Sequence, residues 1–264
     1  MNDITAAFHE YFEIIIADTP ALLKKVFDLR YQMLCINQCM PGFDASNYPD
    51  KLEKDEFDKR SLHLLLRHRP SNTFVGTLRL IFSKDTDQKL PLELHTQFYP
   101  AYTNMNVPRW QTVEISRFII LSNFFRRKDD SYFLTNKIAM ENFVKERRRF
   151  PHPMLGLLVG LIQMCARYNI YYWFCVMDPA LNRLLGFYGM QLEPIGPLVS
   201  YHGLRRPYYV CLLDVLERMY ANHRDIWELV TDNGRIWPVN LEHFKSICGH
   251  QQSVPNPDTN IESC

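Results

Sequence analysis

The chain has 264 residues, of which 47% are hydrophobic and 13% aromatic, which is enough to bury a substantial core. Its formal net charge of +1 provides no global field that would favour nucleic acid or a membrane surface as a partner. Seven cysteines form no CxxC pair, and the first residues, MNDITAAFHE, contain no signal peptide. Both observations favour the reducing cytoplasm and leave any electrostatic recognition to local groups of charges.

The first predicted helix starts at Asp18-Thr19-Pro20, where a capping side chain is followed by proline in the first turn. The stretch ALLKKVFDLRYQML that follows has apolar residues at helical spacing, and Arg30 falls on the same stripe. A charge on the core-facing side of an amphipathic helix requires an explanation. Residues 37–60 then form a polar loop that ends in a cluster of acidic side chains.

Two strands are predicted next, SLHLLLRHR and TFVGTLRLIFS, joined as a hairpin by the turn RPSN. Arg79 interrupts the apolar run of the second strand. After a long connection over residues 84–111, the stretch TVEISRFIIL (residues 112–121) indicates a buried strand that carries Glu114 and Arg117. Because strand side chains alternate with a period of two, these residues, three apart, are expected on opposite faces.

The second half begins with a basic, irregular insertion that contains one predicted helix, over residues 136–148. A core helix over residues 154–168 follows, in an apolar segment too short to span a bilayer. We then expect the buried strand IYYWFCVM, a helix that starts at Asp178-Pro179, a strand over residues 208–213 and one or two C-terminal helices. This order predicts an α+β sheet flanked by helices, not a regular βαβ alternation.

Charged residues stand at four places where the apolar pattern predicts none. They are Arg30, the acidic set Glu53, Asp55 and Asp58, then Arg79, and finally the pair Glu114 and Arg117. One interpretation is a set of unrelated surface charges plus one structural ion pair. The other is a single buried cluster of three guanidinium groups and four carboxylates. A buried cluster of this kind contributes little to the stability of the fold. Its presence therefore favours a functional site.

The residues around these charges resemble four motifs of the acyl-homoserine-lactone synthases and the related N-acyl amino acid synthases. In order they are LR at 29–30, EKDEFD at 53–58, VGTLRL at 75–80 and EISRF at 114–118. With its basic insertion and longer C-terminus, the chain is most similar to the bacterial acyltransferases associated with PEP-CTERM/exosortase systems. The resemblance covers residues 21–196.

This resemblance implies the GNAT acyltransferase fold, a central mixed sheet with splayed strands, flanked by helices and extended by C-terminal helices. Residues 1–213 would form the acyltransferase domain, residues 214–250 a helical extension packed on it, and residues 251–264 a disordered tail. In that family a fatty acyl thioester enters a cleft between two splayed parallel strands. The fourth strand carries a bulge there, so we expect an irregularity within residues 114–122.

The resemblance also implies roles for individual residues. Glu114 would be the general base that deprotonates an ammonium acceptor; the alternative is a structural partner of Arg30 or Arg117. Ser116 and Arg117 complete the candidate catalytic set, and backbone N–H groups of the splayed strand are the expected oxyanion donors. The predicted substrate-binding residues, which hold the acceptor side, shape the cleft or line the acyl tunnel, are Arg30, Asp55, Asp58, Arg79, Phe118, Met154 and Leu158.

Two departures from the family pattern bear on the substrates. The tryptophan and phenylalanine of the lactone synthases correspond to Met40 and Leu34, which favours an amino acid over S-adenosylmethionine as acceptor. The pyrophosphate-binding loop R/Q-x-x-G-x-G/A is absent between residues 121 and 155. Two basic clusters there are either solvated surface or a docking site for an acidic acyl carrier protein. They consist of Arg126, Arg127, Lys128, Arg147, Arg148 and Arg149.

The leading hypothesis is therefore an N-acyltransferase that moves a long fatty acyl group from acyl carrier protein to the amine of an amino acid or similar acceptor. The alternatives are an acyl-homoserine-lactone synthase that uses S-adenosylmethionine, and a non-catalytic module that binds acyl carrier protein. No metal is expected, because the nine histidines form no HExxH or paired motif. No cofactor is expected beyond the acyl-phosphopantetheine that the carrier protein would bring as substrate.

Overall fold

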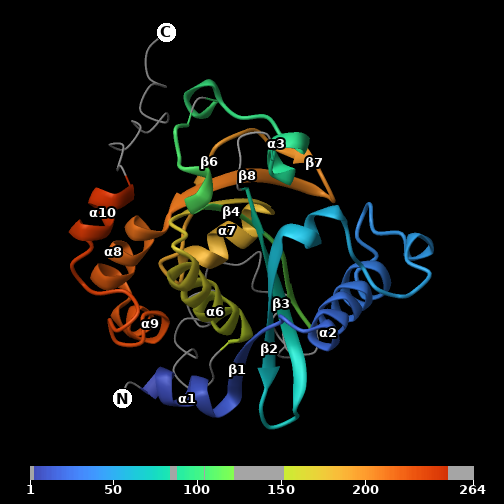
Figure 1. The fold of residues 1–264 in the computed structure, drawn as a ribbon, viewed down its shortest axis with the longest axis horizontal. Coiled ribbons are helices and arrows are strands. Elements are labelled where there is room, and N and C mark those ends of the chain that lie inside the picture. Colours follow the sequence, from blue (N-terminus) through green and yellow to red (C-terminus); the bar gives the residue numbers. More distant parts are fainter. Residues whose placement is uncertain (1–2, 84–87, 104, 122–151, 249–264) are drawn as a thin grey trace.

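The computed structural model describes residues 3–83, 88–103, 105–121 and 152–248. Its strands form a mixed sheet in the order β1-β2-β3-β4-β5-β8-β6, with β7 paired to β8 (Figure 1). Their bounds are β1 Phe12–Ile16, β2 Ser61–His68, β3 Thr73–Phe82, β4 Thr112–Ile120, β5 Tyr172–Met177, β6 Glu193–Pro194, β7 Val199–Ser200 and β8 Leu204–Cys211. Only the β4–β5 pair is parallel among these ladders. The expected GNAT-like α+β architecture is confirmed.

Helices cover this sheet and extend it at the C-terminal end. Their bounds are α1 Asp3–Tyr11, α2 Pro20–Tyr31, α3 Pro91–His95, α6 Pro153–Tyr168, α7 Pro179–Gly186, α8 Leu212–Asn222, α9 Arg224–Val230 and α10 Glu242–Cys248. A π-helical turn, Gln32–Asn37, prolongs α2, and short 3-10 turns occupy Ala45–Asn47, Glu56–Arg60, Pro100–Tyr102 and Arg109–Gln111. None of the helices in the described ranges is long and apolar enough to cross a membrane.

Helix α2 begins where the sequence predicts, because the Thr19 hydroxyl accepts a hydrogen bond from the N–H of Leu22 (3.3 Å) ahead of Pro20 at the first turn. The predicted hairpin is also present as β2 and β3, paired antiparallel. Strand β2 is buried on both faces, with Leu64 and Leu66 in the main core and Leu65 against α2. Its nearly continuous apolar run follows from this burial.

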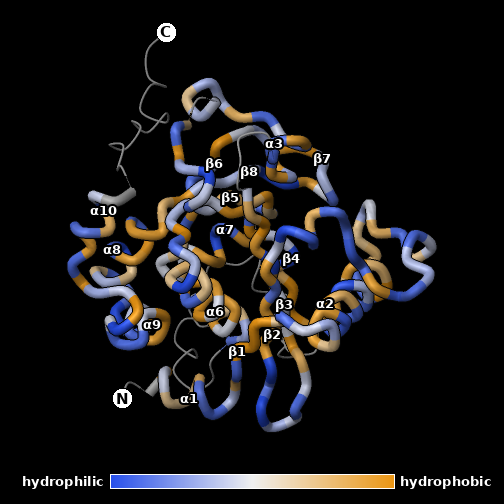
Figure 2. The backbone as a smooth tube through the Cα atoms, viewed as in Figure 1, coloured by the Kyte–Doolittle hydropathy of each residue, from blue (hydrophilic) through white to orange (hydrophobic). Residues whose placement is uncertain are grey.

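The main core lies between the sheet and α6, whose residues are almost all buried. Gly156 and Gly160 allow α6 to approach β2 closely, since an added Cβ would lie 2.7 Å from Leu66 and 2.1 Å from Leu64. Figure 2 shows the hydrophobic stretches concentrated on α6 and the central strands. Apolar residues of α8 and α9, such as Leu216 and Trp227, belong to the same core.

Three parts of the predicted element order are wrong. Residues 3–16, for which no element was predicted, form α1 and the edge strand β1. The last long strand starts and ends earlier than expected, since β8 covers Leu204–Cys211 and Leu212 already belongs to α8. Three C-terminal helices occur in place of one or two. The helix predicted over residues 136–148 and the tail from residue 251 lie outside the described residues.

Candidate active site

A cavity of about 990 Å³ opens where the two parallel strands separate. Strands β4 and β5 pair from Thr112 with Tyr172 to Ile115 with Cys175, and their pairing stops there. Beyond this point β4 remains paired with β3, whereas β5 pairs with β8. The cavity is lined by residues 114–120 of β4 and by Cys175–Met177 of β5. The expected cleft between splayed strands is therefore present.

A bulge in β4 explains how Glu114 and Arg117 come to share this cavity. Thr77 of β3 pairs with Ile119, and Arg79, two residues later, pairs with Ser116, so β4 contains one extra residue. Arg117 adopts a positive φ of 51°, which is uncommon for a residue with a side chain. The insertion resets the alternation of side chains. Both Glu114 and Arg117 consequently line the cavity, and the predicted irregularity is confirmed.

Three arginines and three carboxylates form a closed ring beside the cleft, which we call the ion ring. Arg30 binds Glu53 and binds Asp58 through two hydrogen bonds of 2.8 and 3.2 Å. Arg79 binds Asp58 (2.7 Å) and Asp55 (2.6 Å). Arg117 binds Asp55 (3.1 Å) and returns to Glu53 (2.8 Å). Each group thus bridges two of opposite charge, and the ring is formally neutral.

Because these side chains are buried, each charge needs a partner of opposite charge. Arg30 and Glu53 are both 0% exposed, and Arg79 is 1% exposed. Burial would raise the pKa of Glu53, but the charges of Arg30 and Arg117 outweigh it and lower that pKa to about 2. The pKa of Asp58 is likewise lowered by Arg30 and Arg79 against the effect of burial. Glu53 and Asp58 therefore stay ionised at neutral pH.

Glu114 lies outside the ion ring, which corrects the expected balance of three guanidinium groups against four carboxylates. Its carboxylate accepts a hydrogen bond from the backbone N–H of Leu92 (2.8 Å), in the first turn of α3. Ion pairs between Glu114 and Arg30 or Arg117 are absent from the described residues. Glu114 is only 3% exposed, and burial raises its pKa to about 8. A carboxyl group with this pKa can exchange a proton near neutral pH.

The hairpin of β7 and β8 supplies a cavity wall that the sequence analysis missed. Its residues Tyr201, His202 and Arg205 line the cavity opposite the loop that carries Phe43. His202 stacks obliquely on Phe43 with ring centroids 4.4 Å apart, and its Nδ1 lies 3.0 Å from the Pro41 carbonyl. No prediction was made for this hairpin, in whose turn His202 and Gly203 both adopt positive φ.

The remaining predicted residues divide between the cavity and its surroundings. Ser116 lines the cavity and its hydroxyl accepts a hydrogen bond from Nε of Arg79 (2.9 Å). Phe118 and Leu158 line the cavity, whereas Met154 is buried in the core and is not part of the lining. The two basic clusters at residues 126–128 and 147–149 lie outside the described residues. Candidate metal sites are absent from the part of the chain that is described.

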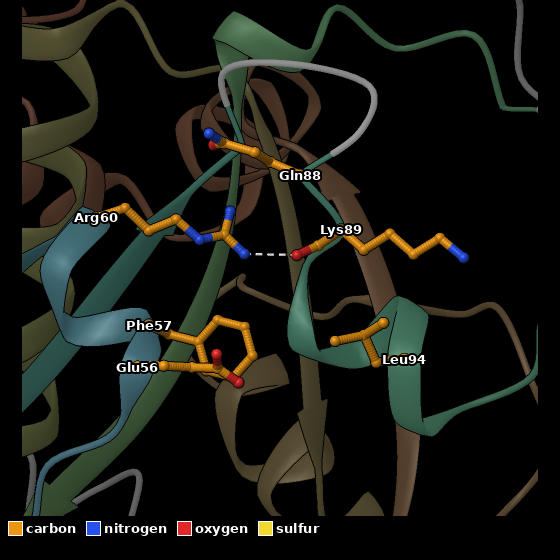
Figure 3. A pocket seen from close by; sticks show the side chains of 6 residues that line it. All are labelled: Glu56, Phe57, Arg60, Gln88, Lys89 and Leu94. Atoms are coloured by element: carbon orange, nitrogen blue, oxygen red, sulfur yellow. Dashed lines mark hydrogen bonds between the residues drawn. The ribbon is translucent and has the colours of Figure 1, made fainter.

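A second, shallower hollow of about 390 Å³ adjoins the 3-10 turn that follows Asp55 (Figure 3). Arg60 crosses one side of it and donates a hydrogen bond to the carbonyl of Lys89. Phe57 lines both this hollow and the main cavity. Glu114 and the separating ends of β4 and β5 line the main cavity and not this hollow, so the chemistry is assigned to the main cavity.

Comparison with known proteins agrees with this geometry. Residues 29–135 match a family model described as an acetyltransferase (GNAT) domain. This segment contains every member of the ion ring and Glu114. The match covers less than half of the chain; together with the splayed sheet it indicates a GNAT-like acyltransferase fold. A search of curated proteins finds no match to the chain.

Several solved structures have a similar fold. The CoA-dependent acyl-homoserine lactone synthase BjaI, with SAM and isopentyl-CoA, is 16% identical, with a TM-score of 0.53 over 87% of this chain and 90% of that chain. The AHL synthase LasI is 15% identical, with a TM-score of 0.50 over 80% and 95%. FeeM, an N-acyl amino acid synthase from uncultured soil microbes, is 12% identical, with a TM-score of 0.47 over 78% and 93%. Identities this low establish the fold and not the substrates.

Proposed function

We propose that this protein is an N-acyltransferase that moves a long fatty acyl group from a thioester donor to the amine of an amino acid. The observation that carries the proposal is Glu114, a buried carboxyl with a pKa of about 8 in a large cavity between splayed strands. Acyl carrier protein is the proposed donor, and acyl-CoA is the alternative. The link to PEP-CTERM/exosortase systems and the cytoplasmic location stay predictions from the sequence.

The cavity offers the two environments that such a transfer needs. One part is apolar, with Leu158, Leu161, Leu184 and Leu192 available to an acyl chain. The other part is polar and contains Glu114 and Arg117. Beyond Ile115 the backbone of β4 is no longer paired with β5, so its N–H groups on that edge are the proposed oxyanion donors.

The proposed reaction starts with an acceptor bound as its ammonium. The Glu114 carboxylate removes a proton, and the free amine attacks the thioester carbonyl to form the new N–C bond. The nitrogen then gives up its second proton as the C–S bond breaks, and the leaving thiolate takes up a proton. A carboxyl whose pKa is about 8 suits this step, because its proton affinity is close to that of an amine.

Lactone synthesis from S-adenosylmethionine remains the second candidate, because BjaI and LasI share the fold. Leu34 and Met40 do line the cavity, at the positions where the lactone synthases have aromatic rings. Phe43 is aromatic, but its ring already lies against the Arg117 guanidinium, 4.8 Å from its centroid. Other aromatic side chains, among them Phe57, Phe118 and Tyr201, also line the cavity, so only Leu34 and Met40 disfavour a sulfonium acceptor.

Mass spectrometry of lipid extracts tests the proposed function. A bacterium that expresses the protein should accumulate an N-acyl amino acid that is absent when the variant Glu114→Gln is expressed at the same level. A lactone in place of this product would support the second candidate. If no new lipid forms under any tested condition while acyl carrier protein still binds, both enzymatic functions are refuted and a carrier-binding module remains.

The apolar part of the cavity makes a prediction about chain length. Leu158→Phe should shorten the preferred acyl chain, because Leu158 lines the cavity and a larger ring occupies space beside it. Overpacking costs about 1–3 kcal/mol, so the variant should still fold. Leu158→Met, which conserves volume, is the control and should leave the product profile unchanged. An unaltered profile in Leu158→Phe would mean that the acyl chain lies elsewhere.

A further inference from the structure

Arg205 on β8 differs from the other arginines of the cavity. Arg79 and Arg117 each bind two carboxylates of the ion ring. The side chain of Arg205 lines the same cavity and is partly buried, yet it forms no ion pair or hydrogen bond with any described residue. A partly buried guanidinium group that has no partner among the described residues keeps its five donors for solvent or for a ligand.

The groups around Arg205 leave it without an ion pair among the described residues. Burial lowers the pKa of Arg205, and the like charge of Arg117 lowers it further. Tyr201 and Asp178 act in the opposite direction, and the Asp178 carboxylate also caps α7 by accepting the N–H of Ala180 (2.7 Å). His202 has its pKa lowered by burial. The donors of Arg205 are therefore available to an anion that enters the cavity.

Arg205 and Glu114 both line the cavity. Tyr201, four residues before Arg205 in the hairpin, lines it too, and its pKa is raised by burial and, to a lesser degree, by the charge of Glu114. An α-amino acid carries an amine and a carboxylate on one carbon. The cavity offers a proton acceptor for the amine at Glu114 and an unpaired planar donor at Arg205. Arginine is the side chain best suited to bind a carboxylate through two hydrogen bonds.

We propose that Arg205 binds the carboxylate of the acceptor, so that the acceptors are free amino acids and not their amides or simple amines. This inference rests on the proposed N-acyl transfer. It assigns Arg205 as a specificity-determining residue for the acceptor, separate from the ion ring that holds the cleft together. A phosphate of the phosphopantetheine donor is another anion that Arg205 can bind, and the experiment below separates the two sources.

The kinetic test compares the wild type with Arg205→Gln and Arg205→Lys, using an amino acid and its carboxamide as paired acceptors. Arg206→Gln is the matched control, since Arg206 is the next residue of β8 and does not line the cavity. The wild type should prefer the acid. Arg205→Gln should raise the KM for the acid about 10- to 100-fold, as expected for a lost charge-assisted pair, and leave the amide unchanged. Arg205→Lys should restore part of the preference, and Arg206→Gln should match the wild type.

A binding test avoids any dependence on turnover. Calorimetry should show that N-dodecanoylglycine binds the wild type more tightly than N-dodecanoylglycinamide, and that Arg205→Gln binds both equally. If the wild type acylates no amine, the proposed function fails. The binding assay still tests the role of Arg205 in that case, because it compares the affinities for acid and amide without turnover. Equal binding of acid and amide to the wild type would overturn the inference. So would a KM increase for the acyl donor alone, which would assign Arg205 to the donor phosphate.

Discussion

Glu114→Gln is expected to lower kcat/KM by a factor of about 10² to 10⁴, the usual contribution of a positioned general base. Glutamine is close in shape to the carboxyl group and its oxygen can still accept the N–H of Leu92, so the fold of the cleft should be preserved. The difference in kcat/KM between the wild type and Glu114→Gln therefore measures the contribution of the carboxylate as a proton acceptor. Initial rates with purified protein, acyl donor and amino acid measure the effect, and circular dichroism checks that the variant is folded.

The pH dependence provides a second observable for the same residue. If the Glu114 carboxylate is the base, kcat/KM should rise about tenfold per pH unit below its pKa of about 8 and then level off. Glu114→Gln should lack this rise. A wild-type profile that is flat between pH 6 and 9, together with a variant within threefold of it, would refute the assignment.

The ionisation of Glu114 should make stability fall as pH rises, whereas activity should rise. Its pKa is raised from 4.5 to about 8 by folding, so the folded protein holds this proton more tightly than the unfolded chain. The contribution to stability is therefore full below about pH 4.5, decreases as pH rises, and is lost above about pH 8. Glu114→Gln cannot ionise. It should be more stable than the wild type at pH 9, by on the order of a few kcal/mol, in urea unfolding.

Arg30→Met is expected to destabilise the fold by roughly 3–5 kcal/mol, because it leaves Glu53 and Asp58 buried with one arginine fewer. Urea unfolding measures the loss. Lys54→Met is the matched control: Lys54 pairs with Asp50 at a site where the side chains are 52% and 44% exposed, and such pairs contribute under about 1 kcal/mol. If Arg30→Met costs no more than this control, the ion ring does not hold the loop in place.

The ion ring also predicts an acid limit to stability. The pKa of Glu53 is lowered from 4.5 to about 2 in the folded protein, so its contribution is present above about pH 4.5 and is lost as pH falls toward 2. Asp58 shifts in the same direction. Arg30→Met removes a main cause of both shifts and should flatten this acid-induced loss. Combining Arg30→Met with Glu53→Gln should cost less than the sum of the single changes, because the two groups are coupled.

The elements that sequence reasoning placed correctly are those with strong periodicity or clear capping residues. Helix α2 begins after Thr19 and α7 after Asp178, each with the predicted side-chain cap. Strand β1 was missed because it is a short edge strand whose one charge, Glu13, pairs with Arg67 of the neighbouring strand. A five-residue run gives too few positions for a period to be read.

The sequence predicted which residues belong to the candidate site but not which of them form ion pairs with one another. Each ring member was visible because it interrupts an apolar pattern or forms part of the acidic cluster. The sequence could not show that Glu114 lies outside the ring, because that depends on α3 bringing the N–H of Leu92 to its carboxylate. Arg205 was missed for a different reason. It follows a turn on a partly exposed hairpin, where an arginine is ordinary, and its significance depends on the absence of a partner in space.

The ion ring has a consequence for how the chain folds during its synthesis. Arg30, Glu53, Asp55 and Asp58 all precede β4, whereas the bond from Glu53 to Arg117 spans 64 residues. Until Arg117 has left the ribosome, three carboxylates face only two arginines. The acidic loop then carries an unbalanced charge and has reason to remain hydrated. Because such distant contacts form late, the polar wall of the cleft should close only after β4 has been synthesised and paired with β3.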